Sequence, residues 1–155
     1  MEITKINIAN RDELIKRVYE LTSVQHDLVV GGVSSHKIIY DYGFDPAFKD
    51  LLIKVLSVLD PDYRIEDTWF NIYKKGGYVK EHNHKSEKYP NSKTGVYYLK
   101  KPLNSGDLYI ENKKIDLEED DFIIFDGHKN HFTSKNETNE DRVIVSFNFV
   151  YKIKQ

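Results

Sequence analysis

The sequence predicts a mainly β fold of the α+β kind, with two helices near the N-terminus and a jelly roll after them. Helix-like periodicity is confined to residues 1–60, and from Arg64 onward short apolar runs alternate with turn residues. The 11 Tyr and 8 Phe also favour strands, because aromatic side chains suit a pleated, half-buried surface. Regularly spaced short strands are typical of double-sheet barrels and jelly rolls. We expect the two helices to pack against the outside of one of the sheets.

The first elements are expected to form a helical support region over residues 1–60. Glu2 to Ile8 alternates polar and apolar residues, which indicates a strand. Asn10 then caps a first helix, with Glu13 at the capping-box position. An apolar stripe at helical spacing gives this helix a buried face, made of Leu14, Val18 and Leu21.

A second helix follows a short strand and turn at Val29 to Gly32. Asp45 is its expected N-cap and Pro46 lies in its first turn, while Asp60-Pro61 ends it. Apolar residues at helical spacing form its expected buried face: Phe48, Leu51, Leu52, Val55, Leu56 and Leu59.

Strands dominate the region 64–153, which we expect to be the jelly-roll core. The expected strands are Ile65 to Tyr73, Tyr78 to Glu81, Thr94 to Leu99, Asp107 to Ile110, Lys114 to Leu117, Phe122 to Phe125 and Arg142 to Ile153. Turn signals separate them, among them Gly76-Gly77 and Asn104 to Asp107. No linker divides the chain, so residues 1–155 are expected to form a single domain.

Composition excludes several classes of function. A net charge of -2 gives no general attraction to nucleic acid or to an anionic membrane. The absence of cysteine excludes disulfides and thiolate–zinc sites. No apolar run has membrane-spanning length, and Met1 to Lys5 lacks the apolar core of a signal peptide, so a cytoplasmic protein without a membrane partner is expected. Oligomeric state is left open.

Three histidines are candidates for a metal site. His82 and His84 stand two residues apart after a strand-like run, so both side chains leave the same face. His131 follows another strand-like run and a polar turn. Imidazoles arriving from two strands can hold one divalent metal and leave coordination positions open. His128 is a rival of His131, whereas His26 and His36 are expected at the surface.

Arg142 is a candidate anion-binding residue, because it begins an apolar strand where a guanidinium needs a partner. Ser146 lies on the same face of that strand. Thr94 and Tyr98 share a face of another strand, and their hydroxyls beside Arg142 would complete a carboxylate clamp. A metal next to a buried arginine suggests that a small-molecule cosubstrate with a carboxylate, such as a dicarboxylate, binds there. An exposed edge strand with Arg142 paired to an acid is the alternative.

These motifs together resemble the 2-oxoglutarate and Fe(II)-dependent dioxygenase superfamily. The resemblance runs from Trp69 to Phe149 and is closest to the prolyl-hydroxylase-like branch and to small phage and bacterial members. It rests on the order of five motifs: Trp69 to Tyr78, His82-Asn83-His84, Thr94 to Leu99, Phe122 to Phe125, and His131 followed by Arg142. The fold it implies is the double-stranded β-helix.

The resemblance also implies an activity and site roles. The activity would be an oxygenase reaction, hydroxylation of a C–H bond, with Fe(II) as metal and 2-oxoglutarate as cosubstrate. His82 and His131 match the metal histidines, and Arg142 matches the residue that pairs with the distal carboxylate of 2-oxoglutarate. Thr94 and Tyr98 match positions that assist this carboxylate. Tyr73 matches a tyrosine near the metal end of the cosubstrate.

One position departs from the family pattern, because His84 stands where His-x-Asp would place a carboxylate. Three imidazoles still suit Fe(II), with one negative charge fewer. Glu87 or Asp107 could serve as the carboxylate instead, or catalysis could be lost. A three-histidine enzyme of cupin type that works without 2-oxoglutarate, and a non-catalytic jelly-roll binding module, stay as alternatives. The substrate is left open among peptides, nucleotides and small molecules.

Overall fold

The computed structural model describes residues 1–152, and these form two α-helices, two short 3₁₀ helices and ten strands. The helices are α1 (Arg11–Glu20), η1 (Tyr42–Phe44), η2 (Pro46–Phe48) and α2 (Lys49–Val58). The strands are β1 (Glu2–Lys5), β2 (Val24–His26), β3 (Val29–Ser34), β4 (Tyr63–Val79), β5 (Lys93–Lys100), β6 (Leu108–Ile110), β7 (Lys113–Ile115), β8 (Asp121–Asp126), β9 (His131–Thr133) and β10 (Arg142–Tyr151).

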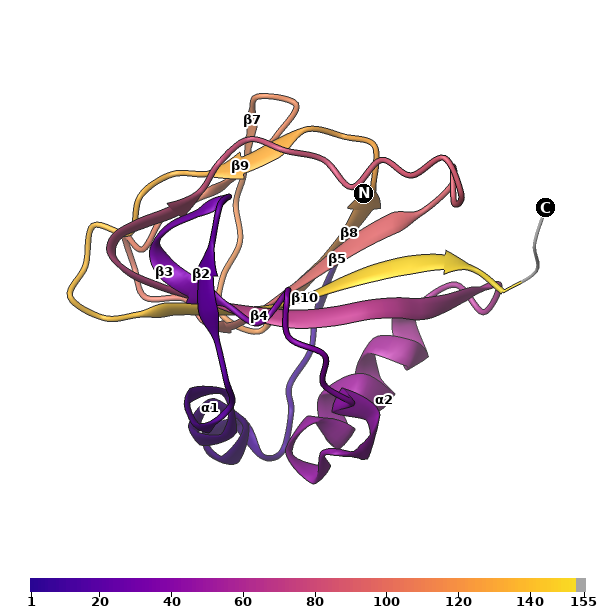
Figure 1. Ribbon diagram of the computed structural model, residues 1–155, viewed down its shortest axis with the longest axis horizontal. Coiled ribbons are helices and arrows are strands. Elements are labelled where there is room, and N and C mark those ends of the chain that lie inside the picture. Colours follow the sequence, from indigo (N-terminus) through magenta and orange to yellow (C-terminus); the bar gives the residue numbers. More distant parts are fainter. Residues whose placement is uncertain (153–155) are drawn as a thin grey trace.

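The strands form two sheets that face each other, with the helices on the outside of the larger one (Figure 1). The larger sheet has the order β1-β8-β5-β10-β4-β3-β2, and the smaller one has the order β7-β6-β9. Every strand pair is antiparallel. The predicted jelly roll with two helices on one sheet is therefore confirmed. No helix within residues 1–152 has both the length and the apolar character needed to cross a membrane.

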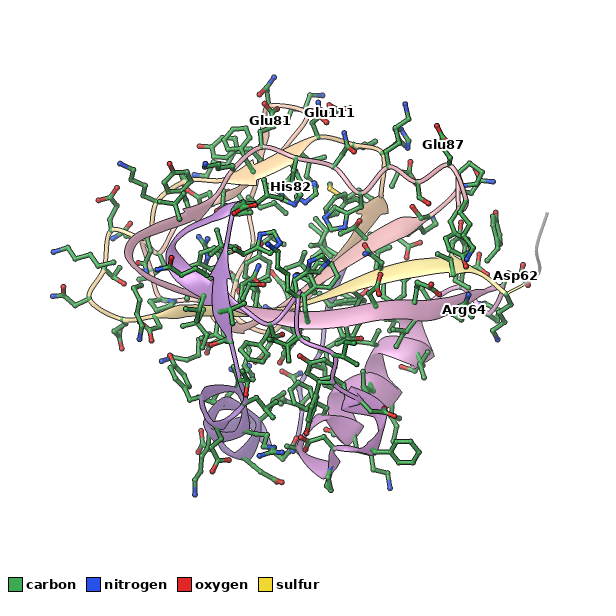
Figure 2. The ribbon with its side chains drawn as sticks, in the orientation of Figure 1. Asp62, Arg64, Glu81, His82, Glu87 and Glu111 are labelled. Carbon is green, nitrogen blue, oxygen red and sulfur yellow. The ribbon has the colours of Figure 1, made fainter. Side chains whose placement is uncertain are left out.

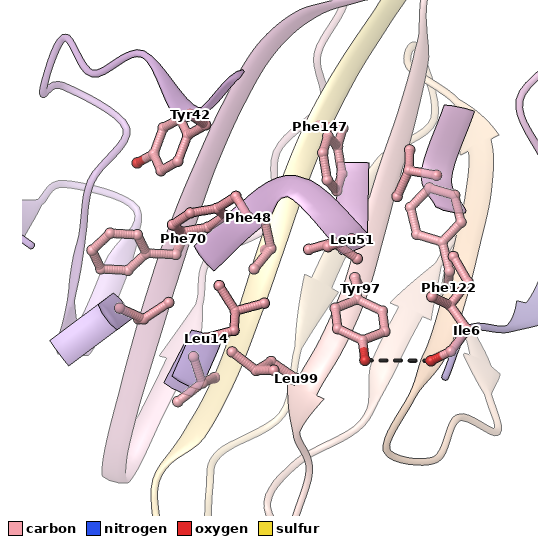
Figure 3. Close-up of a cluster of buried hydrophobic side chains, with 14 of the residues drawn as sticks. Ile6, Leu14, Tyr42, Phe48, Leu51, Phe70, Tyr97, Leu99, Phe122 and Phe147 are labelled. Carbon is pink, nitrogen blue, oxygen red and sulfur yellow. Dashed lines mark hydrogen bonds between the residues drawn. The ribbon is translucent and has the colours of Figure 1, made fainter. Parts of the chain in front are cut away.

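The main core lies between the larger sheet and the helices (Figure 3). Leu14 of α1 and Leu51 of α2 are fully buried there, against Phe70 and Phe147 from the central strands. The apolar spacing of α2 predicts this face correctly except at Leu56, which is 52% exposed. A ten-residue helix presents only one stripe to the sheet, and Leu56 lies outside it.

A second apolar cluster fills the space between the two sheets. It joins Tyr73, Tyr98 and Ile144 of the larger sheet to Leu108 and Ile110 of β6. Alternate residues along a strand point to opposite faces, so β4, β5 and β10 each contribute one set of side chains to the helical core and another to the inter-sheet space. The polar members of that second set line part of the candidate site.

The two glycines 76 and 77 do not end a strand, contrary to the sequence prediction, because β4 continues through them to Val79. A Cβ on Gly77 would lie 2.6 Å from the carbonyl oxygen of Gly31, so the pair permits close passage beside an irregular step in β3. Gly76 adopts a left-handed φ of 79° that suits glycine. The glycines thus bend β4 instead of reversing the chain.

Other predicted boundaries differ more modestly. The first strand ends at Lys5 instead of Ile8, and the short strands β2 and β9 were not predicted. No capping box forms, since the Asn10 amide contacts the Glu13 carboxylate and the Ala47 carbonyl, and no side-chain cap bond is made. The last predicted strand residue, Ile153, lies outside the described residues.

Asp45 joins the two helical segments. One carboxylate oxygen accepts a hydrogen bond from the Ala47 backbone N–H at 3.0 Å, as the predicted N-cap should, although of η2 and not directly of α2. The other oxygen accepts from Arg17 Nε of α1 at 2.8 Å and from the Tyr40 hydroxyl. Burial raises the pKa of Asp45, but the hydrogen bonds from Tyr40, Arg17 and Ala47 outweigh it and hold the pKa below its usual range.

Replacing Asp45 with asparagine should lower the free energy of unfolding by about 1–3 kcal/mol, because a buried charge-assisted contact to Arg17 is lost. Urea denaturation at pH 7 measures this. Glu20→Gln is the matched control, since Glu20 faces the same Arg17 at 3.9 Å and is half exposed, and its loss should change stability by under about 1 kcal/mol. Equal stability of Asp45→Asn and the wild type would contradict this role.

Candidate metal centre

His82, His84 and His131 converge at one end of the inter-sheet space. His131 begins β9, and an isolated antiparallel bridge pairs it with His82 through two backbone hydrogen bonds of 3.0 and 2.9 Å. The backbone N–H of His84 donates a hydrogen bond to the Gly127 carbonyl at 2.7 Å. In Figure 2, His82 lies close to β9, between the sheets.

The three rings form a compact triangle. Their centroids are 4.2 Å apart for His82 and His131, 5.1 Å for His84 and His131, and 5.2 Å for His82 and His84. One nitrogen from each ring lies within 4.8 Å of the other two, a spacing from which a single divalent ion can be reached by all three. Among residues 1–152 this is the single group of three or more histidine or acidic side chains with such spacing.

Hydrogen bonds fix the tautomer of each imidazole. Nδ1 of His82 contacts the Lys80 carbonyl at 2.7 Å, Nδ1 of His131 contacts the Lys129 carbonyl at 3.2 Å, and Nδ1 of His84 contacts Asn148 Oδ1 at 2.6 Å. These oxygens only accept, so Nδ1 donates in every case and Nε2 carries the free lone pair. Such outer contacts orient metal-binding histidines in proteins generally.

Burial keeps these imidazoles neutral. Desolvation lowers the pKa of His131 to about 3, helped by the neighbouring His82 and His84. Desolvation likewise lowers the pKa of His84 to about 4 against the opposing hydrogen bond to Asn148, and it lowers the pKa of His82. The neutral form is the one that binds metal, so the apoprotein holds its donors ready at neutral pH.

We expect divalent-metal affinity to change little from pH 7 to about pH 5 and to fall below that. An unperturbed histidine would protonate near about pH 6.5 and lose metal there, but a lowered pKa delays proton competition to more acid conditions. Titration of the apoprotein with Mn(II) in steps of pH measures this, with circular dichroism as the control for folding. A tenfold loss of affinity between pH 7 and 6 in folded protein would contradict it.

The rival ligands lie elsewhere. His128 is exposed in the turn before β9, and Glu87 is exposed in the loop after His84. Asp107 lies 3.7 Å from Lys114 and is not in the histidine group. Neither Glu87 nor Asp107 therefore belongs to the group of side chains whose ligand atoms lie close together, and His84 is the third member of that group.

Arg142 lies in the same inter-sheet space and is 1% exposed. Its Nη1 donates to the Ser105 carbonyl at 2.7 Å and its Nη2 donates to Thr133 Oγ1 at 2.9 Å, while the guanidinium lies 4.3 Å from the centre of the Tyr73 ring. Its Nε has no partner, and none of the ion pairs among residues 1–152 involves Arg142. The alternative of an exposed arginine paired with an acid is therefore wrong. A buried cation without an anion is costly, so Arg142 stays a candidate for binding an anionic ligand.

One cavity connects Arg142 to the histidines. It holds about 60 Å³ of free space, and all the predicted site residues line it: Tyr73, His82, His84, Thr94, Tyr98, His131, Arg142 and Ser146. Thr94 Oγ1 and Asn71 Oδ1 are buried there, and neither has a hydrogen-bond partner in the described part of the chain, residues 1–152. Together with Arg142 Nε they offer polar contacts that a bound dicarboxylate or its metal-bound water would satisfy.

Tyr73, which the resemblance assigns to the metal end of the cosubstrate, lines the cavity and packs its ring against Arg142. The two residues are direct cross-strand partners in the β4–β10 register. The hydroxyl accepts from Asn71 Nδ2 at 3.0 Å, so Tyr73 lies between Arg142 and Asn71.

Sequence reasoning did not identify the residues that hold the site residues in place. Ser105 and Thr133 bind the guanidinium, and Asn148 orients His84. Gly106 passes so close that a Cβ there would lie 2.2 Å from Arg142 Nη1, and its φ is +106°. The turn signal Asn104 to Asp107 was visible in the sequence, but a contact across 37 residues was not.

Comparison with known proteins supports the fold. No model of a known protein family matches the sequence, and no curated protein matches it. Solved structures do: HygX from Streptomyces hygroscopicus with nickel, 2-oxoglutarate and hygromycin B bound has a TM-score of 0.68 at 12% identity, over 97% of this chain and 82% of that chain. The viral collagen prolyl hydroxylase vCPH from Paramecium Bursaria Chlorella virus-1, in its 2-oxoglutarate complex, has a TM-score of 0.65 at 16% identity, over 99% and 97%.

A third structure is that of a prolyl hydroxylase, the kind of protein that the sequence was expected to resemble. The prolyl hydroxylase from Trichoplax adhaerens, in complex with a hypoxia inducible factor peptide fragment, has a TM-score of 0.68 at 17% identity, over 97% of this chain and 84% of that chain. The class of fold is therefore that of the 2-oxoglutarate and Fe(II) oxygenases. Identities this low show the fold alone, so the activity depends on the site.

Proposed function

We propose that this protein is a 2-oxoglutarate and Fe(II)-dependent oxygenase that hydroxylates a C–H bond of its substrate. The observation that carries the proposal is one cavity with three convergent Nε2 lone pairs at one end and a buried arginine without an acidic partner in its lining. A metal together with a carboxylate ligand satisfies both features, and 2-oxoglutarate has the two carboxylates that such a cavity would bind.

The metal ligands would be His82, His84 and His131 through Nε2. Imidazole suits Fe(II), and three of them leave coordination positions for other ligands. Asn148 holds His84 by its side-chain oxygen while its Nδ2 donates to Asp67 at 3.2 Å, which fixes the amide orientation. In His84, a neutral imidazole thereby stands where the family pattern has a negatively charged carboxylate. We therefore expect this site to bind metal more weakly than a site with an aspartate.

Arg142 would bind the distal carboxylate of 2-oxoglutarate. Ser105 and Thr133 bind its Nη1 and Nη2, so the guanidinium is preoriented before a ligand arrives. The hydroxyls of Thr94, Tyr98 and Ser146 line the same cavity and would donate to that carboxylate. Burial raises the pKa of Tyr98, so its hydroxyl stays a donor throughout the working range of pH.

Iron and 2-oxoglutarate would supply the redox chemistry, in which dioxygen is consumed, 2-oxoglutarate becomes succinate and carbon dioxide, and a substrate C–H becomes C–OH. The chain positions the ligands and excludes water. Val96, Leu108 and Ile144 supply an apolar lining that limits competing reactions with solvent.

Calorimetry under anaerobic conditions tests the proposal. We expect Mn(II) to bind the apoprotein, 2-oxoglutarate to bind the Mn(II) protein, and each ligand to tighten the binding of the other. With Fe(II) and dioxygen, succinate should form. Metal binding without any effect of 2-oxoglutarate would favour the cupin-type enzyme, and no succinate under any condition would favour the binding module.

A further inference from the structure

A second hollow lies outside the metal cavity, along the outer edge of β4. It holds about 550 Å³ and is lined on one side by residues 65–69 of β4 and on the other by residues 36–43. Leu52 and Leu56 of α2 close it below. Figure 1 shows the segment after β3 descending past β4 towards α2, which leaves this groove between them.

No strand within residues 1–152 pairs with the β4 edge in this groove. Pairing of β3 with β4 ends at Ser34 and Asn71, and the last contacts on that side join Ser35 to Phe70, whose N–H and C=O both point towards β3. Backbone groups of alternate residues point to the same side, so the N–H and C=O of Thr68 face the groove. No backbone hydrogen bond outside the strand ladders reaches Thr68 within residues 1–152.

The groove continues to the metal centre. His36 and Trp69 line both this groove and a narrower hollow of about 230 Å³ whose walls include His82 and His84. The Trp69 indole is stacked on the His84 ring, with centroids 5.7 Å apart and an interplanar angle of 21°. A chain that followed the β4 edge past Trp69 would therefore arrive at the candidate metal ligands.

The lining indicates what side chains such a ligand would carry. Ile38, Ile39 and Ile65 offer apolar contacts, and Ile39 and Leu56 are strongly exposed. The lining has three acidic residues, Asp41, Glu66 and Asp67, against one lysine, Lys37, and no arginine. Glu66 is paired with Arg64, but Asp67 is exposed and accepts a hydrogen bond from the neutral Asn148. Carboxylates repel phosphate, which disfavours a nucleic acid here.

We propose that an extended peptide with alternating apolar and basic side chains docks on the free edge of β4 between residues 65 and 69 and presents its next residue to the metal centre. Backbone hydrogen bonds to the edge supply affinity, and the apolar and acidic lining selects the side chains. The proposal deepens the proposed oxygenase function and rests on it, since it assigns the substrate class of that same site.

Fluorescence anisotropy with the Mn(II) and 2-oxoglutarate-loaded protein, kept anaerobic, tests the docking. The probe is a labelled ten-residue peptide of alternating Lys and Val. One comparison peptide has alternating Glu and Val. The other has the Lys–Val sequence with N-methyl groups on alternate residues. We expect the Lys–Val peptide to bind at least tenfold more tightly than either, because the others lose charge complementarity or backbone donors.

Two variants, each with a control variant, locate the contact. Thr68→Pro removes one groove-facing N–H and should weaken the Lys–Val peptide about tenfold, whereas Thr68→Val keeps the N–H and should bind as the wild type does. Asp67→Asn keeps an acceptor for Asn148 and should weaken the peptide about threefold, whereas Glu2→Lys on the distant β1 should not. Mn(II) and 2-oxoglutarate affinities, measured on each variant, show that the site is intact.

The outcomes separate the two proposals. The docking proposal alone is overturned if the protein binds Mn(II) and 2-oxoglutarate but binds the Lys–Val peptide no more tightly than the Glu–Val peptide or the N-methylated Lys–Val peptide. Equal peptide affinity for the wild type and Thr68→Pro does the same, as does tighter binding of a ten-nucleotide thymidine strand than of the peptide. Failure to bind 2-oxoglutarate overturns the proposed function, whatever the peptide does.

Discussion

Replacing Arg142 with lysine should weaken 2-oxoglutarate binding by about 30-fold to several-thousand-fold, which corresponds to the roughly 2–5 kcal/mol lost when a buried charge pair is disrupted. The guanidinium is 1% exposed, is held by Ser105 and Thr133, and rests on the Tyr73 ring. An ammonium group has no planar fork that can bind a carboxylate while its face stacks on a ring, so it cannot make all these interactions at once.

Calorimetric titration of 2-oxoglutarate into protein saturated with Mn(II) measures the effect, and Mn(II) affinity itself should barely change. Arg64→Lys is the matched control, because Arg64 lies on β4 with its side chain 43% exposed and is not part of the cavity lining. Equal 2-oxoglutarate affinities of Arg142→Lys and the wild type would remove the main support for the dioxygenase and leave the cupin-type enzyme or the binding module.

Replacing His131 with alanine should lower Mn(II) affinity at least tenfold, since the loss of outer contacts to a metal ligand alone has effects of about that size. His131 is 5% exposed, and its ring lies between those of His82 and His84 and the Phe125 ring. His128→Ala is the matched control, three residues away and exposed, and should bind Mn(II) as the wild type does.

His84→Ala resolves the departure from the His-x-Asp pattern. If His84 is the third ligand, its loss should also weaken Mn(II) binding at least tenfold. Unchanged affinity in His84→Ala would mean that another group completes the site, in which case the bond from His84 to Asn148 would serve only to shape the cavity wall.

The local pattern of the sequence determined most of the architecture. Period-two alternation and turn residues located β5, β8 and β10, and helical spacing located α1 and the buried face of α2 except for Leu56. These signals depend on which side of an element faces apolar neighbours, and that information is contained within a few adjacent residues. The same alternation identified His82, His84, Thr94, Tyr98 and Arg142 as side chains on shared faces.

Long-range contacts decided the rest. The turn signal Gly76-Gly77 became a bend within β4, because β3 passes against it at Gly31. Only the bridge to His82 shows that His131, and not His128, lies in the histidine group. The strand β9 exists because it pairs with β6.

By itself, the sequence predicted three candidate imidazoles and one candidate arginine on the inner faces of a jelly roll, from residue type, strand periodicity and the family resemblance, while His128 and an exposed Arg142 stayed open as alternatives. Only the tertiary structure decided that the arginine lacks an acidic partner, that all three Nε2 atoms are free, and that one edge of β4 stays unpaired beside them. Each of these depends on which distant segment arrives at a given hydrogen-bonding group, and local patterns carry no record of that choice.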